Sequence, residues 1–244
     1  MSIVLEVAVQ DPGGAAAAAR GGADRVELCS ALALGGLTPS GGLVAAAVAV
    51  GLPVHVLIRP RAGGFDYTDA ERALVYADVQ GAVDAGAAGV VVGATRAGKA
   101  DLDLVQRVRE LAGQVEVTFH RAFDTLLDRA GALEQLIGVG VDRVLTSGGA
   151  TRAPDALPEL AALAEQARGR IQVMAGAGID VASVAAVAAT GVPAVHSSAK
   201  RLVRDPLPVG LGSLAESGEV VRETTDEQVV RALRAALDRA GEPR

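Results

Sequence analysis

Three observations on the sequence predict a single-domain (β/α)8 TIM barrel, an α/β fold, over residues 1–244. Eight aliphatic runs resemble strands, stretches with helical patterning separate them, and no linker-like break interrupts the chain. The composition agrees, because 50% of the residues are hydrophobic and only 2% are aromatic. A core built from Ala, Val, Leu and Ile suits parallel strands that helices cover. A doubly wound sheet is the alternative, but it usually has fewer strands and a helix-opening GxGxxG motif. That motif is absent here, so no nucleotide cofactor is predicted.

The expected strands follow the apolar runs in chain order, and helix signals lie between them. Asp11-Pro12 and Thr38-Pro39 each place a capping residue before a proline, which is typical of a helix start. Capping boxes begin at Thr68 and Thr225. Glycines that follow the helical stretches are suited to ending them. The strands are expected over residues 3–9, 24–29, 53–61, 89–94, 115–124, 142–148, 171–178 and 194–199.

Residues 202–223 fit neither a strand nor a helix pattern well. We expect an irregular loop or extension before the last helix. A functional loop over the barrel mouth is the alternative, and residues 62–67 after the third strand are another candidate for such a loop.

Composition and charge exclude several classes of function. The net charge of −6 and the absence of a Lys/Arg-rich block argue against nucleic acid or an anionic membrane as the main partner. The first residues lack a signal-peptide pattern, and no apolar run approaches the roughly 20 residues that span a bilayer. The only cysteine, Cys29, cannot form an internal disulfide, which suits a reducing compartment. We therefore expect a soluble cytoplasmic protein.

Charged residues lie inside three of the expected strands. Glu6, Glu27 and Arg59 would enter a water-poor barrel, where an unpaired charge costs several kcal/mol, so we expect these three to pair. They either form a structural ion network or orient arginines toward an anionic ligand. Arg59 and Arg61 lie two residues apart near a strand end, where active sites of this fold are found, and this favours anion binding for both.

All three histidines fall in expected strands. His120 lies late in its strand, beside Arg121 and near Asp124, where a general acid or base is expected. Its unperturbed pKa near 6.5 suits that chemistry, although a hydrogen-bonded core histidine is the alternative. His55 comes early in its strand and is expected to be structural. For His196 the sequence favours neither role.

The last three expected strands end in small and polar residues, in TSGGA (146–150), AGAGI (175–179) and HSSAK (196–200). Small residues allow backbone N–H groups to approach a ligand, and phosphate sites in this fold are common after the seventh and eighth strands. Lys200 either adds charge there or is solvated. We expect a phosphate or carboxylate group at Gly148, Gly149, Gly176, Gly178, Ser197 and Ser198.

These segments also carry a resemblance to a known family. The sequence resembles the copper homeostasis protein CutC family through GADRVELC with GGLTPS, IRPR followed by GGFDY, VTFHRAFD, DRVLTSGG, MAGAG and VHSSA. The resemblance covers nearly the whole chain. It implies a TIM barrel, a cytoplasmic homo-oligomer (a homodimer or homotetramer) and copper binding. The residues it carries over are Glu27, Cys29, Arg59, Arg61, His120, Arg121, Asp124, Ser147, Gly148, His196 and Ser197.

Cys29 is the copper ligand that the resemblance implies. Other members often have cysteines in the first strand, where this chain has VAVQ at residues 7–10. Cu(I) prefers thiolate and thioether ligands, and the only methionines are Met1 and Met174. A copper site at a subunit interface, or one that combines Cys29 with a histidine, stays open.

Three functions fit the sequence, and whether the protein is an enzyme is left open. The first is copper handling with Cys29 as a ligand. The second is acid–base chemistry on a small phosphorylated or carboxylated metabolite at the barrel mouth. The third is a non-catalytic scaffold. In the enzyme hypothesis His120, Glu27 and Asp124 are catalytic, the two arginines and the small residues bind the anion, and Glu6, Arg121 and His196 are further pocket residues.

Overall fold

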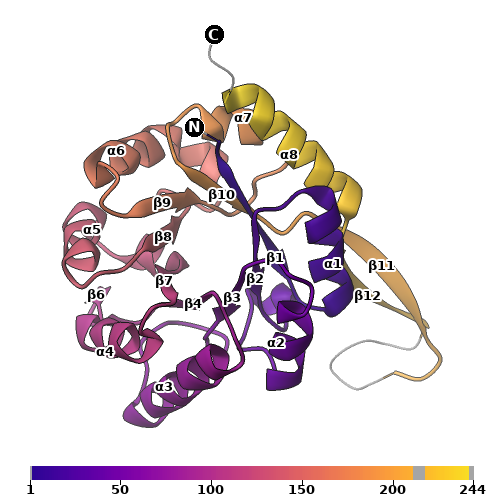
Figure 1. Cartoon of the computed structure of the whole chain (residues 1–244), viewed down its shortest axis with the longest axis horizontal. Helices are drawn as coiled ribbons and strands as arrows, with labels where there is room; N and C mark the ends of the chain where they lie inside the picture. Colours follow the sequence, from indigo (N-terminus) through magenta and orange to yellow (C-terminus); the bar gives the residue numbers. More distant parts are fainter. Residues whose placement is uncertain (1, 211–217, 242–244) are drawn as a thin grey trace.

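The structure, a computed structural model, describes residues 2–210 and 218–241. Its centre is a closed barrel of parallel strands in the order β1-β10-β9-β8-β7-β4-β3-β2, and helices surround the strands (Figure 1). The predicted (β/α)8 barrel and all eight of its expected strands are confirmed. The strands are β1 (Val4–Val9), β2 (Arg25–Leu28), β3 (Val54–Leu57), β4 (Gly89–Val92), β7 (Glu116–Phe119), β8 (Arg143–Thr146), β9 (Gln172–Ala175) and β10 (Ala194–Ser197).

Helices follow the barrel strands, and capping residues mark where several of these helices begin. At α1, Asp11 accepts a hydrogen bond from Gly14 N–H and Pro12 begins the helix, as predicted. The capping box at Thr68 is also confirmed. The helices are α1 (Pro12–Gly21), α2 (Gly41–Val48), α3 (Asp69–Asp84), α4 (Leu102–Ala112), α5 (Arg129–Gly138), α6 (Leu157–Ala167), α7 (Val184–Ala188) and α8 (Glu227–Gly241). Short elements complete the chain: the 3-10 helices η1 (Leu32–Leu34), η2 (Arg121–Thr125) and η3 (Ala153–Ala156), and the strand pair β5 (Thr95–Arg96) and β6 (Lys99–Ala100).

Two predicted helix starts are wrong by one or two residues. Ser40, not Thr38, caps α2, because the Thr38 hydroxyl accepts a hydrogen bond from the backbone N–H of Arg59. Asp226, not Thr225, caps α8, since its carboxylate accepts from the N–H groups of the first turn.

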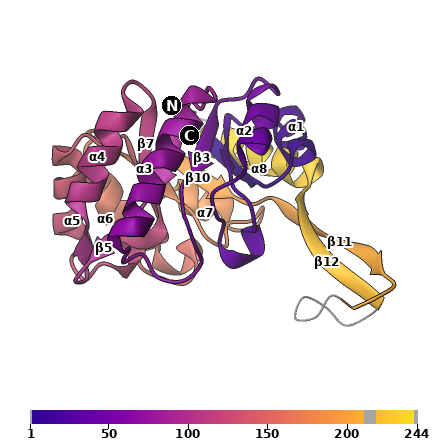
Figure 2. The ribbon, with the colours of Figure 1, turned by 90° about the horizontal axis from the view of Figure 1, so that it is seen from below.

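Residues 202–223 are not irregular over the part that the structure describes. They belong to an antiparallel hairpin of β11 (Lys200–Leu207) and β12 (Gly218–Thr225), which extends away from the barrel (Figures 1 and 2). Ion pairs between Arg204 and Glu219 and between Arg222 and Asp205 join the two strands. The prolines and glycines between 206 and 212 conceal this pairing in the sequence. Residues 211–217 lie outside the described part.

No helix within residues 2–210 and 218–241 is both long enough and apolar enough to cross a membrane.

A repeated Asp-Arg-Val motif places two arginines at the amino end of the barrel. Asp24 and Asp142 each accept a hydrogen bond from a backbone N–H of the preceding barrel strand, at 2.7 and 2.8 Å. The following residues, Arg25 and Arg143, begin β2 and β8 and are only 7% and 3% exposed. Both guanidinium groups donate to the same side-chain oxygen of Gln172, at 3.1 and 2.5 Å.

These arginines belong to a hydrogen-bonded series that runs through the barrel interior. Arg143 bonds to Glu116 at 2.7 Å, and Arg25 bonds to Glu6 at 2.5 Å. Glu6 in turn bonds to His196 Nδ1 at 2.8 Å. We call this series the buried polar chain; its members are Arg143, Gln172, Arg25, Glu6 and His196, and Glu116, whose side chain is 48% exposed, ends it at the surface.

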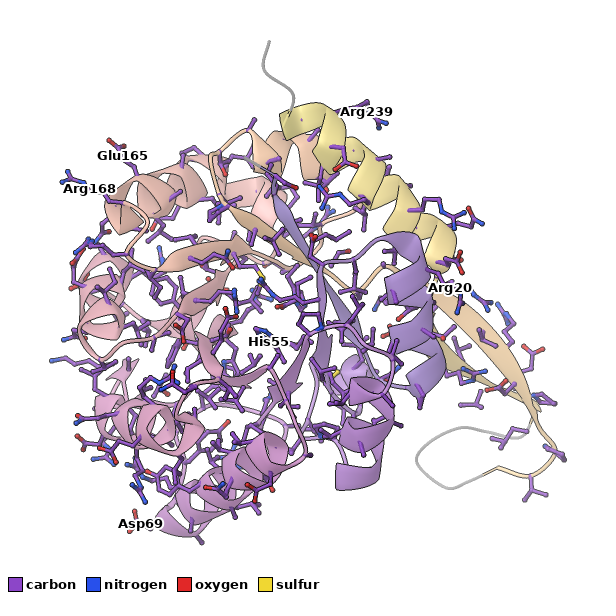
Figure 3. All side chains as sticks on the ribbon, in the orientation of Figure 1. Arg20, His55, Asp69, Glu165, Arg168 and Arg239 are labelled. Atoms are coloured by element: carbon purple, nitrogen blue, oxygen red, sulfur yellow. The ribbon has the colours of Figure 1, made fainter. Side chains whose placement is uncertain are left out.

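His55 lies beside the buried polar chain, inside the ring of strands (Figure 3). One ring nitrogen is 3.3 Å from Arg143 Nη1 and the other is 3.4 Å from Glu116 Oε2. Burial lowers the pKa of His55 to about 4, despite the neighbouring Glu6. The geometry agrees with the structural role expected for it.

Candidate functional site

A cavity of about 500 Å³ lies at the carboxyl ends of the barrel strands. This is the end at which barrels of this type hold their active sites. Its apolar wall includes Leu34 and Phe65, which sequence reasoning did not single out. Nine of the polar or glycine residues considered from the sequence line it: Glu27, Arg59, His120, Arg121, Gly178, His196, Ser197, Ser198 and Lys200.

Glu27 is a buried carboxylate that borders the cavity. Its side chain comes from β2, it is 6% exposed, and its Oε2 has no hydrogen-bond partner within the described residues. Burial raises the pKa of Glu27 to about 7, and the nearby negative charge of Glu6 acts in the same direction while His196 opposes it. Glu27 therefore exchanges a proton with its surroundings near neutral pH.

Glu6 lies below the cavity and is fully buried. It bonds to Arg25 and His196, and it does not pair with Arg59. Burial opposes the ionisation of Glu6, but the His196 hydrogen bond and the Arg25 charge hold its pKa well below the usual range. For His196, burial favours the neutral ring, but Glu27 and Glu6 outweigh burial and raise its pKa.

The expectation that Glu6, Glu27 and Arg59 pair with one another is therefore wrong. Arg25 takes the place of Arg59, because β1 and β2 align Glu6 with Arg25. Arg25 was missed because it stands at the edge of its apolar run. The repetition of Asp-Arg-Val at 24–26 and 142–144 was the available signal.

Arg59 is a cation in the cavity wall without an ion pair among the described residues. Its guanidinium donates to the backbone carbonyls of Leu34, Gly36 and Gly63 at 2.9–3.0 Å, and its Nε has no partner. The group also lies 5.4 Å from the centre of the Phe65 ring. Carbonyl oxygens fix its position but leave its positive charge uncompensated, so this wall favours an anion.

Arg61 does not line the cavity. It forms an ion pair with Glu71 and donates to the carbonyls of Gly64 and Asp66, while its guanidinium lies over the Tyr67 ring. The structure thus gives Arg61 the role of fastening the loop after β3, rather than the anion clamp expected from its spacing.

His120 follows β7 and is 5% exposed. Its Nδ1 accepts a hydrogen bond from Ala122 N–H at 3.1 Å, which assigns the ring proton to Nε2 in the neutral form. Nε2 has no partner within the described residues. Burial, together with the Arg59 charge, lowers the pKa of His120 to about 3. Near neutral pH the ring is therefore an uncharged hydrogen-bond donor and not a base with a pKa near 6.5.

Asp124 binds the loop after β8 and does not reach the cavity. It accepts hydrogen bonds from the N–H groups of Ser147 and Gly149, both at 3.1 Å, and from Arg121 Nε at 2.8 Å. Gly148 N–H donates to a threonine hydroxyl of the same loop. The donors expected to hold an anion at 147–149 are thus already used, and the catalytic role predicted for Asp124 has no support in this geometry.

The loops after β9 and β10 differ from the loop after β8. Gly178, Ile179 and Ser198 line the cavity, and their backbone N–H groups make no hydrogen bond within the described chain. Ser197 lines it too, but its hydroxyl donates to the Ile179 carbonyl. Gly176 lies outside the lining, and its N–H donates to β8. Gly178 is exposed and Ser198 is half-buried, whereas Ile179 is buried, so these free donors are available to a ligand or to water.

Several residues in or beside this cavity have strained backbone conformations. Ala177, which lines it, has a φ of 82°, and Ala31 and Ala199 beside it have φ values of 49° and 43°. Left-handed conformations are unfavourable for residues with a Cβ and often accompany functional loops.

Cys29 is buried outside the cavity lining. It packs against Leu57 and Val91, and its thiol donates weakly to the Val9 carbonyl at 3.6 Å. Burial, and secondarily the charge of Glu27, raise the pKa of this thiol far above its ordinary value. Without a metal the thiol stays protonated, so a metal would have to displace the proton of a buried thiol.

Comparisons with known proteins agree with this architecture. The family model described as the CutC family matches residues 3–201. A CutC family protein from Rhizobium meliloti is 44% identical over 240 residues, which cover 97% of this chain and 96% of the relative. One from Caulobacter vibrioides is 44% identical over 236 residues, with 96% of each chain covered. The crystal structure of a copper homeostasis protein CutC from Streptococcus agalactiae superposes with a TM-score of 0.77 at 29% identity, and covers 80% of this chain and 98% of that one. The chain therefore belongs to the CutC family.

Proposed function

We propose that the cavity binds a small anionic metabolite and that Glu27 transfers a proton to or from it. The observation that carries this proposal is the unpartnered Glu27 oxygen at the cavity. A buried carboxyl group with a pKa of about 7 is present in both protonation states at neutral pH, which general acid–base catalysis requires.

The rest of the cavity supports an anionic ligand. Arg59 supplies a positive charge without an ion pair in the described chain, and the N–H groups of Gly178, Ile179 and Ser198 supply free donors. The volume of about 500 Å³ falls within the range of about 300–1,000 Å³ found for small-molecule sites.

Metabolite capture tests the proposal. The wild-type protein and Glu27→Gln are incubated with a small-molecule extract, separated from unbound compounds and analysed by mass spectrometry. We expect both to retain an anionic compound and only the wild type to convert it. The surface variant Glu134→Gln should behave as the wild type, because Glu134 lies in an exposed ion pair. Retention of no anion, or equal conversion by Glu27→Gln, would contradict the proposal.

Copper handling is the second candidate. The family name supports it, and so does the one group of three possible ligand residues found among the described residues, Glu6, Glu27 and His196. The ligand atoms of these residues lie within 4.8 Å of one another. However, Glu6 is already bonded to Arg25, and carboxylate oxygens, which make up two of the three ligand residues, do not suit Cu(I). Cys29 is protonated and does not belong to this group of three residues. The described residues therefore do not fit a Cu(I) site, and we derive no step through copper.

A titration with Cu(I) in the presence of a competing chelator tests whether this chain binds Cu(I) through Cys29. We expect Cys29→Ser to bind Cu(I) as weakly as the wild type, because the thiol is buried and protonated. A stoichiometric complex that the substitution abolishes would restore Cys29 as the copper ligand. The cytoplasmic location and the homodimer or homotetramer remain predictions; light scattering after gel filtration tests the oligomeric state.

A further inference from the structure

Three side chains of the cavity lining keep a buried polar atom without a hydrogen-bond partner in the described chain. These atoms are Glu27 Oε2, His120 Nε2 and Arg59 Nε. Buried polar atoms are paired in the great majority of cases, so each of these needs a partner that the folded chain does not supply. The first is a proton acceptor, the second an uncharged donor and the third a cationic donor.

An acceptor and an uncharged donor facing one cavity are the two groups that enolisation needs. A carboxylate removes a proton from the carbon next to a carbonyl, while a neutral donor stabilises the negative charge that develops on the carbonyl oxygen. A neutral imidazole can perform the second task, because its N–H group donates to the carbonyl oxygen and polarises it. His120 is held in this form by the Ala122 N–H group on its other nitrogen.

Two possible nucleophiles of the described lining are already engaged in contacts. The Ser197 hydroxyl donates to a backbone carbonyl, and the Lys200 amine is ion-paired with Glu223. Cys29 is buried in the protein interior and does not line the cavity. A covalent route through these nucleophiles would first have to break those contacts, whereas Glu27 and His120 are ready to act.

The position of the free N–H groups indicates that the anionic group of the ligand is a phosphate. Gly178, Ile179 and Ser198 belong to the loops after β9 and β10, the seventh and eighth strands of the barrel along the chain. Phosphate groups of barrel substrates are commonly bound by these two loops. Glycine suits position 178, since its φ of 65° lies in the left-handed region that residues with a Cβ rarely adopt.

We propose that the cavity enolises a small phosphorylated hydroxy-carbonyl compound, with Glu27 as the base, His120 as the donor to the carbonyl oxygen and the loops after β9 and β10 as the phosphate site. This inference rests on the proposed function and specifies its substrate class. Arg59 adds positive charge to the same wall.

The step is balanced without an oxidant or a cofactor. The C–H bond next to the carbonyl breaks, and its proton passes to Glu27. Its electron pair forms the C=C bond of the enediolate, and the carbonyl π electrons move to the oxygen that accepts the His120 N–H hydrogen bond. After the proton on Glu27 exchanges with solvent, its return to the same carbon completes the exchange of that hydrogen. Isomerisation would in addition need the hydroxyl proton to move between the two oxygens of the enediolate.

Proton exchange in D₂O tests the inference with probes of known structure. Glycolaldehyde phosphate, dihydroxyacetone phosphate and ribulose 5-phosphate are incubated with the protein, and loss of the C–H signal next to the carbonyl is followed by ¹H NMR. Binding is followed in the same tubes by ³¹P line broadening. Unphosphorylated dihydroxyacetone is the control for the phosphate site.

We expect at least one phosphorylated probe to bind and to exchange. Glu27→Gln should slow exchange by about 10²–10⁴-fold. His120→Asn has an amide oxygen that can accept from Ala122 N–H, but its shorter side chain places no donor at the position of Nε2, so it should slow exchange by about 10²–10³-fold. Both variants should keep binding, and Glu134→Gln should match the wild type. The wild-type rate should rise with pH with a midpoint near 7, as Glu27 ionises.

The outcomes separate this inference from the proposed function. Binding of the probes without exchange would overturn the enolisation, while the anion site of the proposed function would stand. If no probe binds although an anionic metabolite is captured from the extract, the phosphate assignment is overturned and the proposed function survives. Exchange that persists in Glu27→Gln would refute the role of Glu27 in both.

Discussion

Replacing Glu27 with glutamine should change how the stability of the protein depends on pH. Glutamine keeps the shape of the side chain but cannot ionise. In the wild type the native state holds the Glu27 proton up to a pKa of about 7, whereas an unfolded chain releases it near 4.5. Between these values the native state binds more protons than the unfolded state, so the free energy of unfolding falls as pH rises.

The magnitude follows from the interval between the two pKa values. Each pH unit of this interval corresponds to about 1.4 kcal/mol, so the wild type loses about 3 kcal/mol between pH 4 and pH 8 through Glu27 alone. Glu27 is 6% exposed, and solvent screening therefore reduces this figure little. The Glu27→Gln variant lacks this loss. The free energy of unfolding of the variant minus that of the wild type should therefore rise by about 3 kcal/mol from pH 4 to pH 8.

Urea unfolding followed by circular dichroism at several pH values measures this difference. His196 also has a raised pKa, so its contribution to stability is present below 6.5 and is lost as pH rises through its folded pKa. Both proteins contain His196, and the difference between them isolates Glu27. Removal of the Glu27 charge also lessens the shift of His196, so the variant loses less stability through His196 as well, which makes the measured gain somewhat larger.

Parallel stability curves for the wild type and Glu27→Gln would refute the reasoning. Such a result would mean that Glu27 titrates in the native state as it does in the unfolded chain. If the curves diverge as predicted, the variant that the proposed function predicts to be inactive gains stability relative to the wild type towards pH 8, as is common for residues kept for catalysis.

Two further predictions concern stability alone. Arg25→Met should destabilise the protein by about 3–5 kcal/mol in urea unfolding, because Glu6 would be left buried without its guanidinium partner. The control Arg170→Met removes an exposed ion pair and should leave the unfolding midpoint nearly unchanged, and equal effects would contradict the argument. Asp124→Asn should cost about 2 kcal/mol and speed amide hydrogen exchange in loop 146–150, measured by mass spectrometry, since a neutral amide replaces the carboxylate acceptor. Unchanged exchange in this loop would show that other contacts hold it.

The sequence predicted the barrel and its strands because local patterns determine both. Aliphatic runs, capping residues and glycines act over a few residues, and each of them is legible without knowledge of the fold. The β11–β12 hairpin was missed because it contributes little to the core: no residue of β11 is buried, and Leu202 is 66% exposed, so its sequence lacks a run of apolar core residues. Its stabilising ion pairs join residues about 15 positions apart, and a local pattern does not show them.

The candidate site was predicted only in part, because its details depend on contacts between distant strands. Glu27, Arg59 and His120 were expected at the barrel mouth, and the structure brings them to one cavity. Their partners were not predictable from spacing: a carboxylate of β1 pairs with Arg25, 19 residues away, and Arg59 bonds to backbone carbonyls. The pKa of a side chain depends on such partners and on burial.

The buried polar chain has a consequence for the thermal behaviour of the protein. Exposure of apolar surface raises the heat capacity of unfolding, whereas exposure of polar surface lowers it, so a barrel interior that contains Arg25, Arg143 and Glu6 flattens the stability curve. The hydration of charged groups also becomes less favourable on heating, which reduces the penalty for keeping these groups out of water. The polar interior of this barrel therefore becomes relatively more favourable as the temperature rises.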